Sequence, residues 1–350
     1  MAGLWMEGFE VHQASTQLAR KWATWTAANT AAGAGRVFGT SYGILSAVAV
    51  TPSLGLKDTL VFGFGLRIAS QQTALNSGAQ GLYLERGGTE QVHIEFVNNS
   101  GSFEIRLLRG ATTLATTSSA FAYGVWHYFE VKVNVHTSTG SYEIRQNEST
   151  VSSGSGLNTA NSGSNQADIF AMRFTSNVST TVLIDDIYVL DTTGGVNDDF
   201  RGDSIVQGLL PSSNGSTIQW TNDAGAGSNF ENVDDAANAA PDEAGAGGTN
   251  SSDTNGQIDL YNMQDATQVQ GAVHFVQLGV QLGMSAAGSR NVKTKYRDPD
   301  TTVVDTGVTH NVNTTVFDEF TQVLDTNPNG SIPWDVSDID GGQFGVEVTA

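Results

Sequence analysis

The strongest constraint on the fold is a two-residue alternation in the sequence VWHYFEVKVNVHTSTGSYEIRQNE, residues 125–148. Apolar side chains recur at every second position from Phe129 to Val135, and mostly polar ones fall between them. Because successive side chains of a strand point to opposite faces, this pattern predicts a strand with one buried face. A turn at 138–140 leads into a second run, so we expect an antiparallel hairpin.

Comparable runs recur along the chain between clusters of glycine, serine and asparagine, which favour turns. With 40 glycines and 6 prolines in the sequence, we expect little helix. The predicted strands lie at 43–50, 58–69, 81–86, 92–97, 102–109, 112–117, 169–174, 257–263, 266–282, 290–297, 301–308, 315–324 and 344–349. A chain of 350 residues exceeds the size of most single cores, so we predict an all-β protein of two antiparallel β-sandwiches.

The boundary between the two domains is predicted within TVLIDDIYVLDTTGGVNDDFRGD, residues 181–203. Its first part is apolar on both faces, which is typical of a buried strand. Strict alternation places Val182, Ile184, Tyr188 and Leu190 on one face and Leu183, Ile187 and Val189 on the other. Residues 192–197 contain two glycines and form the expected joint, giving domains at 1–192 and 193–350. A strand at 205–210 and a turn at 211–215 are expected to follow.

Asp185 and Asp186 interrupt this apolar strand, one on each face. An ionised carboxylate in a buried strand must be paired or hydrogen-bonded, and Arg173 is one candidate partner. In that interpretation the two residues anchor the strand or accept backbone N–H groups. The alternative is calcium binding, but Ca²⁺ requires several oxygen ligands and no compact Asp/Asn loop surrounds the pair. We therefore predict no metal site.

Four aromatic residues, Trp5, Phe9, Trp22 and Trp25, lie close to the N-terminus around a polar segment, 13–27, that would tolerate a helix. Trp carries a large buried area at a low entropic cost, whether in a core or at an interface. The sequence leaves two interpretations open: these side chains fill the core, or they insert into a partner protein.

The acidic charge is concentrated in the second half of the chain. Residues 1–190 contain 11 Lys and Arg against 13 Asp and Glu, a net charge of −2, so residues 191–350 carry −18 of the total −20. Such a field repels phosphate backbones and anionic lipid, and we predict neither a nucleic-acid nor a membrane partner. The charge either maintains solubility or serves to bind a cation or a basic neighbour.

One resemblance covers roughly residues 8–190. The order of its motifs resembles the concanavalin A-like, laminin-G-type jelly roll. These motifs are a strand that begins with Trp, Trp126-His127-Tyr128-Phe129-Glu130-Val131, then a Thr-Gly turn, a strand at 142–148 and a later Ile-Asp-Asp-Ile-Tyr-Val strand. The resemblance implies two curved antiparallel sheets and a sugar-binding concave face or rim. The candidate sugar-stacking residues are Trp126 and Tyr83, although aromatics at strand spacing are more often core residues.

A second resemblance covers residues 185–350. This part of the chain is similar to tailed-bacteriophage virion proteins in an ordered set of short motifs. The set consists of Asp-Asp-Ile-Tyr-Val-Leu-Asp followed by Asn-Asp-Asp-Phe-x-Gly-Asp, then Gln219-Trp220-Thr221, Asn232, Pro241-Asp242, Trp334 and 344–348. It implies a structural component of the tail, the fibre or the head surface, assembled in the host cytoplasm. Its partners would be other virion proteins and further copies of itself, bound in large numbers.

The residue inventory does not favour an enzyme. The six histidines, His12, His93, His127, His136, His274 and His310, include no pair at metal-binding spacing, and the Glu-x-Asp-x-x-Glu pattern of glucanases, the P-loop and the Gly-x-Ser-x-Gly elbow are absent. We expect a non-enzymatic virion protein without a cofactor. The alternative is a lectin-like module that binds a host surface glycan, and a polysaccharide depolymerase is the third hypothesis.

Overall fold

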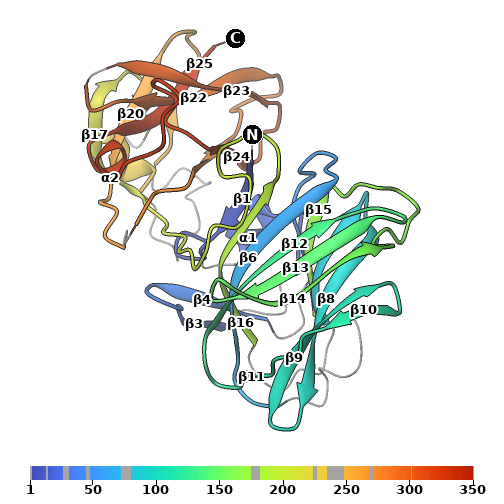
Figure 1. The fold of residues 1–350 in the computed structure, drawn as a ribbon. Helices are drawn as coiled ribbons and strands as arrows, with labels where there is room; N and C mark the ends of the chain where they lie inside the picture. Colours follow the sequence, from blue (N-terminus) through green and yellow to red (C-terminus); the bar gives the residue numbers. More distant parts are fainter. Residues whose placement is uncertain are drawn as a thin grey trace. The chain divides into compact units, whose positions relative to one another are not determined.

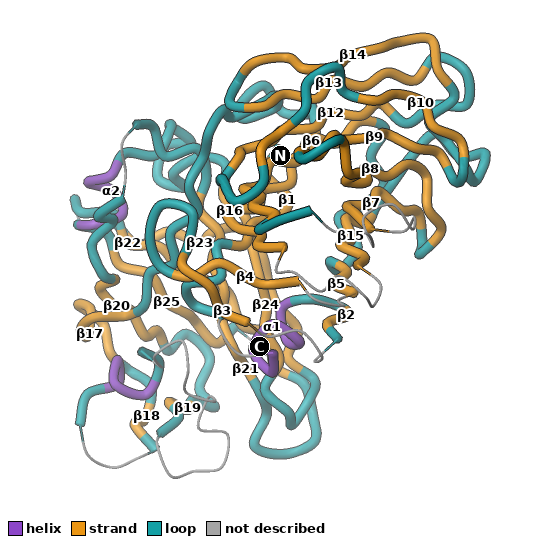
Figure 2. The backbone as a smooth tube through the Cα atoms, turned by 90° about the horizontal axis from the view of Figure 1, so that it is seen from below, coloured by secondary structure: helices purple, strands orange, loops and turns teal. Residues whose placement is uncertain are grey.

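Antiparallel strands make up nearly all regular structure of the chain (Figure 2). The computed structural model describes residues 2–12, 15–26, 31–44, 48–71, 80–174, 182–223, 227–234, 248–268, 271–300 and 302–349. The chain divides into two compact units, Met1–Val206 (unit 1) and Gln207–Ala350 (unit 2), and each is described by itself. The prediction of an all-β protein built of antiparallel sandwiches is confirmed.

Unit 1 consists of two packed eight-stranded sheets (Figure 1). Sheet A has the order β14-β13-β12-β6-β16-β4-β3, with β1 paired to β16, and sheet B has the order β10-β9-β8-β7-β15-β5-β2, with β11 paired to β9. The strands of sheet A are β1 (Gly3–Glu7), β3 (Ala31–Ala34), β4 (Thr40–Ile44), β6 (Thr59–Ile68), β12 (His127–Asn134), β13 (Gly140–Gln146), β14 (Ser149–Leu157) and β16 (Val182–Asp191). Those of sheet B are β2 (Thr24–Trp25), β5 (Val48–Val50), β7 (Gln80–Arg86), β8 (Thr89–Asn99), β9 (Ser102–Arg109), β10 (Thr112–Thr116), β11 (Phe121–Ala122) and β15 (Ile169–Phe174).

The core of unit 1 lies between these sheets and is rich in phenylalanine. Phe62, Phe64 and Phe129 from sheet A meet Phe96 and Phe170 from sheet B, with neighbouring ring centroids 5.3–6.3 Å apart. The predicted alternation of β12 is confirmed, because Phe129, Val131 and Val133 belong to this core. The strand is not half-buried, however, since Tyr128 and Glu130 on its other face are buried as well. Aromatic pairs at such distances add to the free energy gained from burial alone.

The N-terminal aromatic residues belong to the same core, which resolves the question that the sequence left open. Trp5, Phe9 and Trp22 are at most 2 % exposed, and Trp25 packs against the cluster as a partly buried residue. Helix α1 (Ser15–Lys21) places Trp22 edge-on to Trp5, at a centroid distance of 5.4 Å. These side chains therefore contribute to the stability of unit 1.

Strand β16 contains a bulge that reverses its two faces. Asp185 pairs with Gly65, but Tyr188 pairs with Gly63, so β16 uses one residue more than β6 over this stretch. Asp186 takes up the extra length with a φ of 50°, in the left-handed region. The predicted strict alternation is therefore wrong beyond this point: Val182, Ile184, Ile187 and Val189 all face the core.

The segment between β16 and unit 2 belongs to unit 1 as far as Val206, whereas the sequence placed the boundary at residue 192. Residues 197–206, which we call the strap, are tied to unit 1 by hydrogen bonds to Glu130, Arg36 and Asp186. The strand predicted at 205–210 is wrong, since residues 204–210 form no regular structure. The turn predicted at 211–215 is also wrong, because β17 begins at Pro211.

Unit 2 is a smaller sandwich. A five-stranded sheet, β17-β20-β25-β22-β23, is covered by the two-stranded ladder of β21 and β24, and β18 pairs with β19. The strands are β17 (Pro211–Ile218), β18 (Thr221–Asn222), β19 (Asn250–Ser251), β20 (Ile258–Met263), β21 (Val276–Leu282), β22 (Arg290–Arg297), β23 (Val303–Val312), β24 (Asp318–Leu324) and β25 (Gln343–Val348). The short helix α2 (Val336–Asp340) is capped by Asp335.

A buried carboxylate organises the start of unit 2. Asp259 is fully buried and accepts hydrogen bonds from the backbone N–H groups of Gln219 and Trp220, from the Asn229 amide and from the Tyr261 hydroxyl. Burial and the adjacent Asp259 charge raise the pKa of Tyr261. All of these contacts lie within the unit, so Asp259 acts as an anchor for the chain entering the sheet.

Candidate functional site

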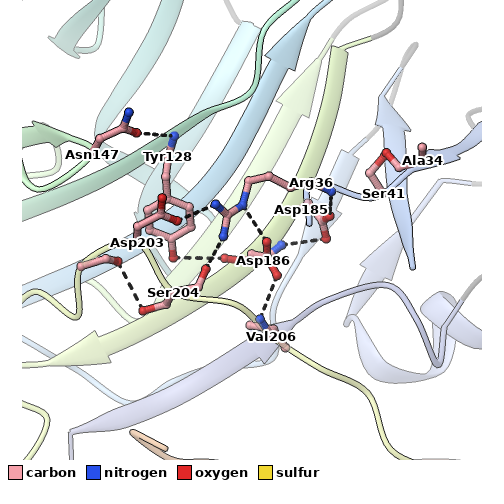
Figure 3. A network of polar contacts seen from close by, with 11 residues as sticks. Ala34, Arg36, Ser41, Tyr128, Asn147, Asp185, Asp186, Asp203, Ser204 and Val206 are labelled. Carbon is pink, nitrogen blue, oxygen red and sulfur yellow. Dashed lines mark hydrogen bonds and ion pairs between the residues drawn. The ribbon is translucent and has the colours of Figure 1, made fainter. Parts of the chain in front are cut away.

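The most extensive polar network of unit 1 surrounds Arg36 (Figure 3). The Arg36 Nε donates to Oδ2 of Asp186 at 2.7 Å, and the other guanidinium nitrogens donate to the Asp203 carboxylate and the Ser204 carbonyl. The guanidinium carbon lies 4.7 Å from the centroid of the Tyr128 ring. Arg36 is therefore paired, hydrogen-bonded and stacked at once, as a largely buried cation requires.

The two aspartates of β16 converge on Arg36, whereas strict alternation placed them on opposite faces. Asp185 accepts the backbone N–H of Arg36, and Asp186 accepts both the Arg36 side chain and the backbone N–H of Val206. The bulge makes this arrangement possible. The interpretation as strand anchors agrees with these bonds, but Arg173, the candidate partner, pairs with Glu85 instead.

Crowding of carboxylates around Arg36 changes their protonation. Burial and the Asp186 charge raise the pKa of Asp185 to about 8, against the stabilising influence of Arg36. Burial, together with the charges of Asp185 and Asp186, raises the pKa of Glu10 to about 10. Burial alone would lower the pKa of Arg36, but Asp186 and Asp203 reverse that effect and raise it. At neutral pH, Glu10 is therefore protonated.

The strap crosses the outer face of sheet A. The Glu130 carboxylate on β12 accepts the backbone N–H groups of Arg201 and Gly202 and the hydroxyl of Tyr188. Phe200 lies 3.9 Å from the Arg145 guanidinium, measured to its ring centroid. This outer face is thus occupied by the chain's own residues, and its charged side chains serve to hold the strap.

Two open hollows with mostly polar linings lie at the rim of the sandwich. An open hollow of about 470 Å³ is lined by Asp58, Asn134, Val135, His136, Gly163, Asn165 and Gln166. An adjoining hollow of about 630 Å³, which shares Gly163, is lined by Arg86, Gly87, Thr89, Ser162, Gly163 and Ser164. Together they form the rim groove, built from the ends of β7, β8 and β12, the start of β6 and the connection from β14 to β15.

Several residues of the rim groove are held in place by bonds to neighbouring residues. Asn165 accepts the backbone N–H of Thr137 at Oδ1, and His136 accepts two backbone N–H groups at Nδ1. The hydrogen of the neutral His136 ring therefore sits on Nε2. Ser162 is fixed by Gln91, which is completely buried and bonds both its hydroxyl and its backbone. Such fixed polar groups lose little conformational entropy when they bind a ligand.

The two predicted sugar-stacking residues are not brought together. Tyr83 lies on β7 and is 5 % exposed, with its ring stacked on His93 at 4.5 Å. Burial and several surrounding carboxylates, Glu90 first, raise its pKa. Trp126 is half-buried and directly precedes β12. Neither lines the rim groove, and the prediction that they bind sugar stays a prediction.

No sequence motif identified the residues of the rim groove as a binding site. They come from four separate parts of the chain, around positions 58, 87, 135 and 164, and none belongs to a recognisable motif. The one available signal was the density of Ser, Gly, Asn and Gln in 158–166, which predicts a polar loop but not what it lies beside. Within the described ranges, no group of His, Asp and Glu is arranged to hold a metal ion. Nor does any helix there have the length and apolarity needed to span a membrane.

No protein-family model matches this sequence, and no curated protein matches it. Among solved structures, the alginate lyase Aly36B is 11 % identical over 53 % of this chain and 96 % of its own, with a TM-score of 0.38. Domain 4 of AbnA, a GH43 extracellular arabinanase from Geobacillus stearothermophilus, is 14 % identical over 46 % of this chain and 74 % of its own, with a TM-score of 0.34. A SAP-like pentraxin from Limulus polyphemus is 12 % identical over 41 % and 69 %, with a TM-score of 0.31. These are distant similarities to jelly-roll sandwich domains.

Proposed function

We propose that this chain is a non-enzymatic carbohydrate-binding protein whose sugar site is the rim groove of unit 1. The observation that carries the proposal is the lining of the groove, where fixed amide, hydroxyl and imidazole groups face an open hollow. Amide side chains both donate and accept hydrogen bonds, which suits the paired hydroxyl groups of a sugar. A shallow, polar, solvent-open site fits a glycan better than it fits a compact apolar ligand.

A glycan array with the whole protein, followed by calorimetry on the best ligand, tests this proposal. Gln166→Ala and Asp58→Ala remove groove side chains and are expected to weaken binding about tenfold or more. Asn311→Ala in unit 2, where the amide bonds Asn291, is the matched control and should bind normally. Loss of binding in Trp126→Ala with full binding in Gln166→Ala would move the site away from the groove. A protein that binds no glycan on the array contradicts the proposal.

The proposal includes no chemical step. Carbohydrate binding without cleavage predicts that a bound polysaccharide keeps its chain length after prolonged incubation with the protein. Size-exclusion chromatography of the polysaccharide measures this directly. Release of oligosaccharides by purified protein would revive the third hypothesis, a depolymerase.

A second proposal concerns where the protein works. The resemblance of residues 185–350 to tailed-phage virion proteins supports a virion component, displayed in many copies and attached to other virion proteins. The concentration of acidic charge in residues 191–350 supports docking of unit 2 on a basic neighbour. Many weak glycan contacts on one particle would then add up to firm attachment to a host surface. Electron microscopy of assembled particles tests this, and particles that lack the protein contradict it.

A further inference from the structure

The rim groove contains the guanidinium group of Arg86, the last residue of β7. Arg86 is exposed, and its side chain makes neither a hydrogen bond nor an ion pair with any described residue. Seven other basic side chains of unit 1 pair with carboxylates, and Arg67 and Arg109 donate to backbone carbonyls. The seven are Lys21, Arg36, Lys57, Arg106, Lys132, Arg145 and Arg173. In a chain with a net charge of −20, an unpaired guanidinium in a hollow stands out as a group available to a ligand.

The carboxylate nearest to this turn in the hydrogen-bond network is already engaged. Asp168 accepts the backbone N–H of Gly87 at Oδ1 and the hydroxyl of Ser53 at Oδ2. It therefore fixes the turn that follows Arg86 without pairing with the arginine. Gly87 and Gly88 have φ values of 52° and 82°, and no atom lies within 4 Å of where a Cβ would stand on either. The space beside these two glycines is therefore open.

The opposite end of the groove has the opposite charge. Asp58 lines the second hollow, is exposed, and its carboxylate accepts no hydrogen bond from the described residues. The amide and imidazole groups of Asn134, His136 and Gln166 line the same hollow. An anionic ligand group is therefore attracted to the Arg86 end and repelled from the Asp58 end, which gives the groove a direction.

We propose that the ligand is an acidic oligosaccharide of at least two sugar units, whose carboxylate pairs with Arg86 while a neighbouring unit occupies the second hollow. This inference rests on the proposed carbohydrate-binding function and adds the substrate class. The two hollows are the reason for proposing a ligand of at least two sugar units. They share Gly163, so one ligand can continue from one hollow into the other. The planar guanidinium of Arg86 is the reason for proposing an acidic sugar, because a guanidinium binds a carboxylate through two parallel hydrogen bonds.

Calorimetry with a uronic-acid oligosaccharide and with the same oligosaccharide after reduction of its carboxyl groups tests the inference. The protein should bind the acidic form about tenfold or more tightly than the reduced form, and Arg86→Gln should abolish that preference. Arg86→Lys keeps the positive charge but loses the paired N–H donors of the guanidinium, so this variant should retain part of the preference for the acidic form. Arg67→Gln is the control, because Arg67 lies near the opposite end of β6 from Asp58, and its one side-chain bond among the described residues is to the Gly124 carbonyl.

The outcomes separate the two levels of the proposal. Equal binding of the acidic and reduced ligands, or an equal loss for both in Arg86→Gln, overturns the acidic substrate class and leaves carbohydrate binding intact. A sulfated oligosaccharide that binds more tightly than the carboxylated one overturns the choice of carboxylate. Binding of single uronic acids as tightly as the disaccharide overturns the two-hollow arrangement. Absence of binding to every glycan overturns the carbohydrate function itself.

Discussion

Arg36 and Asp186 form an ion pair at 2.7 Å although 150 residues separate them in the chain. Their side chains are only 8 % and 3 % exposed, so water screens the pair weakly. The pair joins the β16 bulge to the segment before β4, and through Asp203 it holds the strap as well. One guanidinium thus fixes three parts of unit 1.

Removal of one partner of this pair is expected to destabilise unit 1. Asp186→Asn leaves Arg36 with one charged partner fewer in a buried site, and the expected loss in the free energy of unfolding is about 3 kcal/mol. Asparagine tolerates the left-handed backbone at this position, so the change tests charge rather than strain. Urea unfolding followed by tryptophan fluorescence measures the effect, since Trp5 and Trp22 lie in the same core. An unfolding midpoint equal to that of Arg67→Gln would contradict the prediction.

The stability of unit 1 is expected to fall as the pH rises above neutral. Asp185 and Glu10 keep their protons in the folded state up to pKa values of about 8 and 10, whereas the unfolded chain releases them near their ordinary values of 3.8 and 4.5. The folded state binds more protons over that range, so its stabilisation is lost as the pH passes through 8 and then 10. Thermal unfolding from pH 6 to pH 10 should show the decline, and Glu10→Gln should show a smaller one. Equal slopes for both proteins would argue against the role of Glu10.

An opposite dependence is expected at acid pH. Burial would raise the pKa of Glu7, but Lys21 at 2.9 Å and His12 outweigh it, and the folded-state pKa lies well below the ordinary 4.5. The stabilisation is present above that ordinary value and is lost as the pH falls through the folded-state pKa. Glu7→Gln should remove this acid sensitivity while lowering stability at pH 7. Thermal unfolding between pH 2 and pH 6 measures both effects.

Gly63 on β6 is expected to tolerate no side chain. A Cβ there would overlap the ring of Tyr188 and come within 2.8 Å of the Tyr128 hydroxyl, both of which lie over the strand. Gly63→Ala should cost about 1–3 kcal/mol in the free energy of unfolding, because the rings have to move. Gly271→Ala in unit 2, where no atom lies within 4 Å of the added methyl group, is the control. Equal stability of the two variants would show that the rings adapt freely.

The strap is expected to be required for the stability of unit 1. A chain ending at Val206 retains the bonds to Glu130, Arg36 and Asp186, whereas a chain ending at Thr192 loses all of them. Without the strap, these charged groups are left with fewer partners, so the shorter chain should unfold at a clearly lower temperature. Calorimetry of the two truncated chains decides the matter. Equal melting temperatures would restore the domain boundary to residue 192.

The sequence predicted the local elements of unit 1 well, because alternation is a property of each strand. β9 and β15 begin and end at the predicted residues, and the turn predicted at 138–140 leads from β12 into β13. The β16 bulge escaped prediction because Arg36, which bonds both aspartates at the bulge, is far away in the sequence. In unit 2, Pro211 suggested a turn, yet proline is also accepted as the first residue of an edge strand, which β17 is.

The rim groove could not be predicted for a different reason. Its lining residues come together only in the folded chain, where the β14–β15 connection crosses from sheet A to sheet B beside the β7–β8 turn. None of these residues is unusual on its own, and Arg86 is notable only because no carboxylate of the described residues pairs with it. The strap was missed as part of unit 1 because its anchors are single polar contacts without any periodic pattern.

The β16 bulge also means that the number of residues at this point matters as much as their identity. Deletion of residue 186 alone would restore strict alternation to the strand. Ile187 and Val189 would then turn toward solvent, and Tyr188 and Leu190 would enter the phenylalanine-rich core. Homologous chains should therefore vary in residue type at this position more readily than in length.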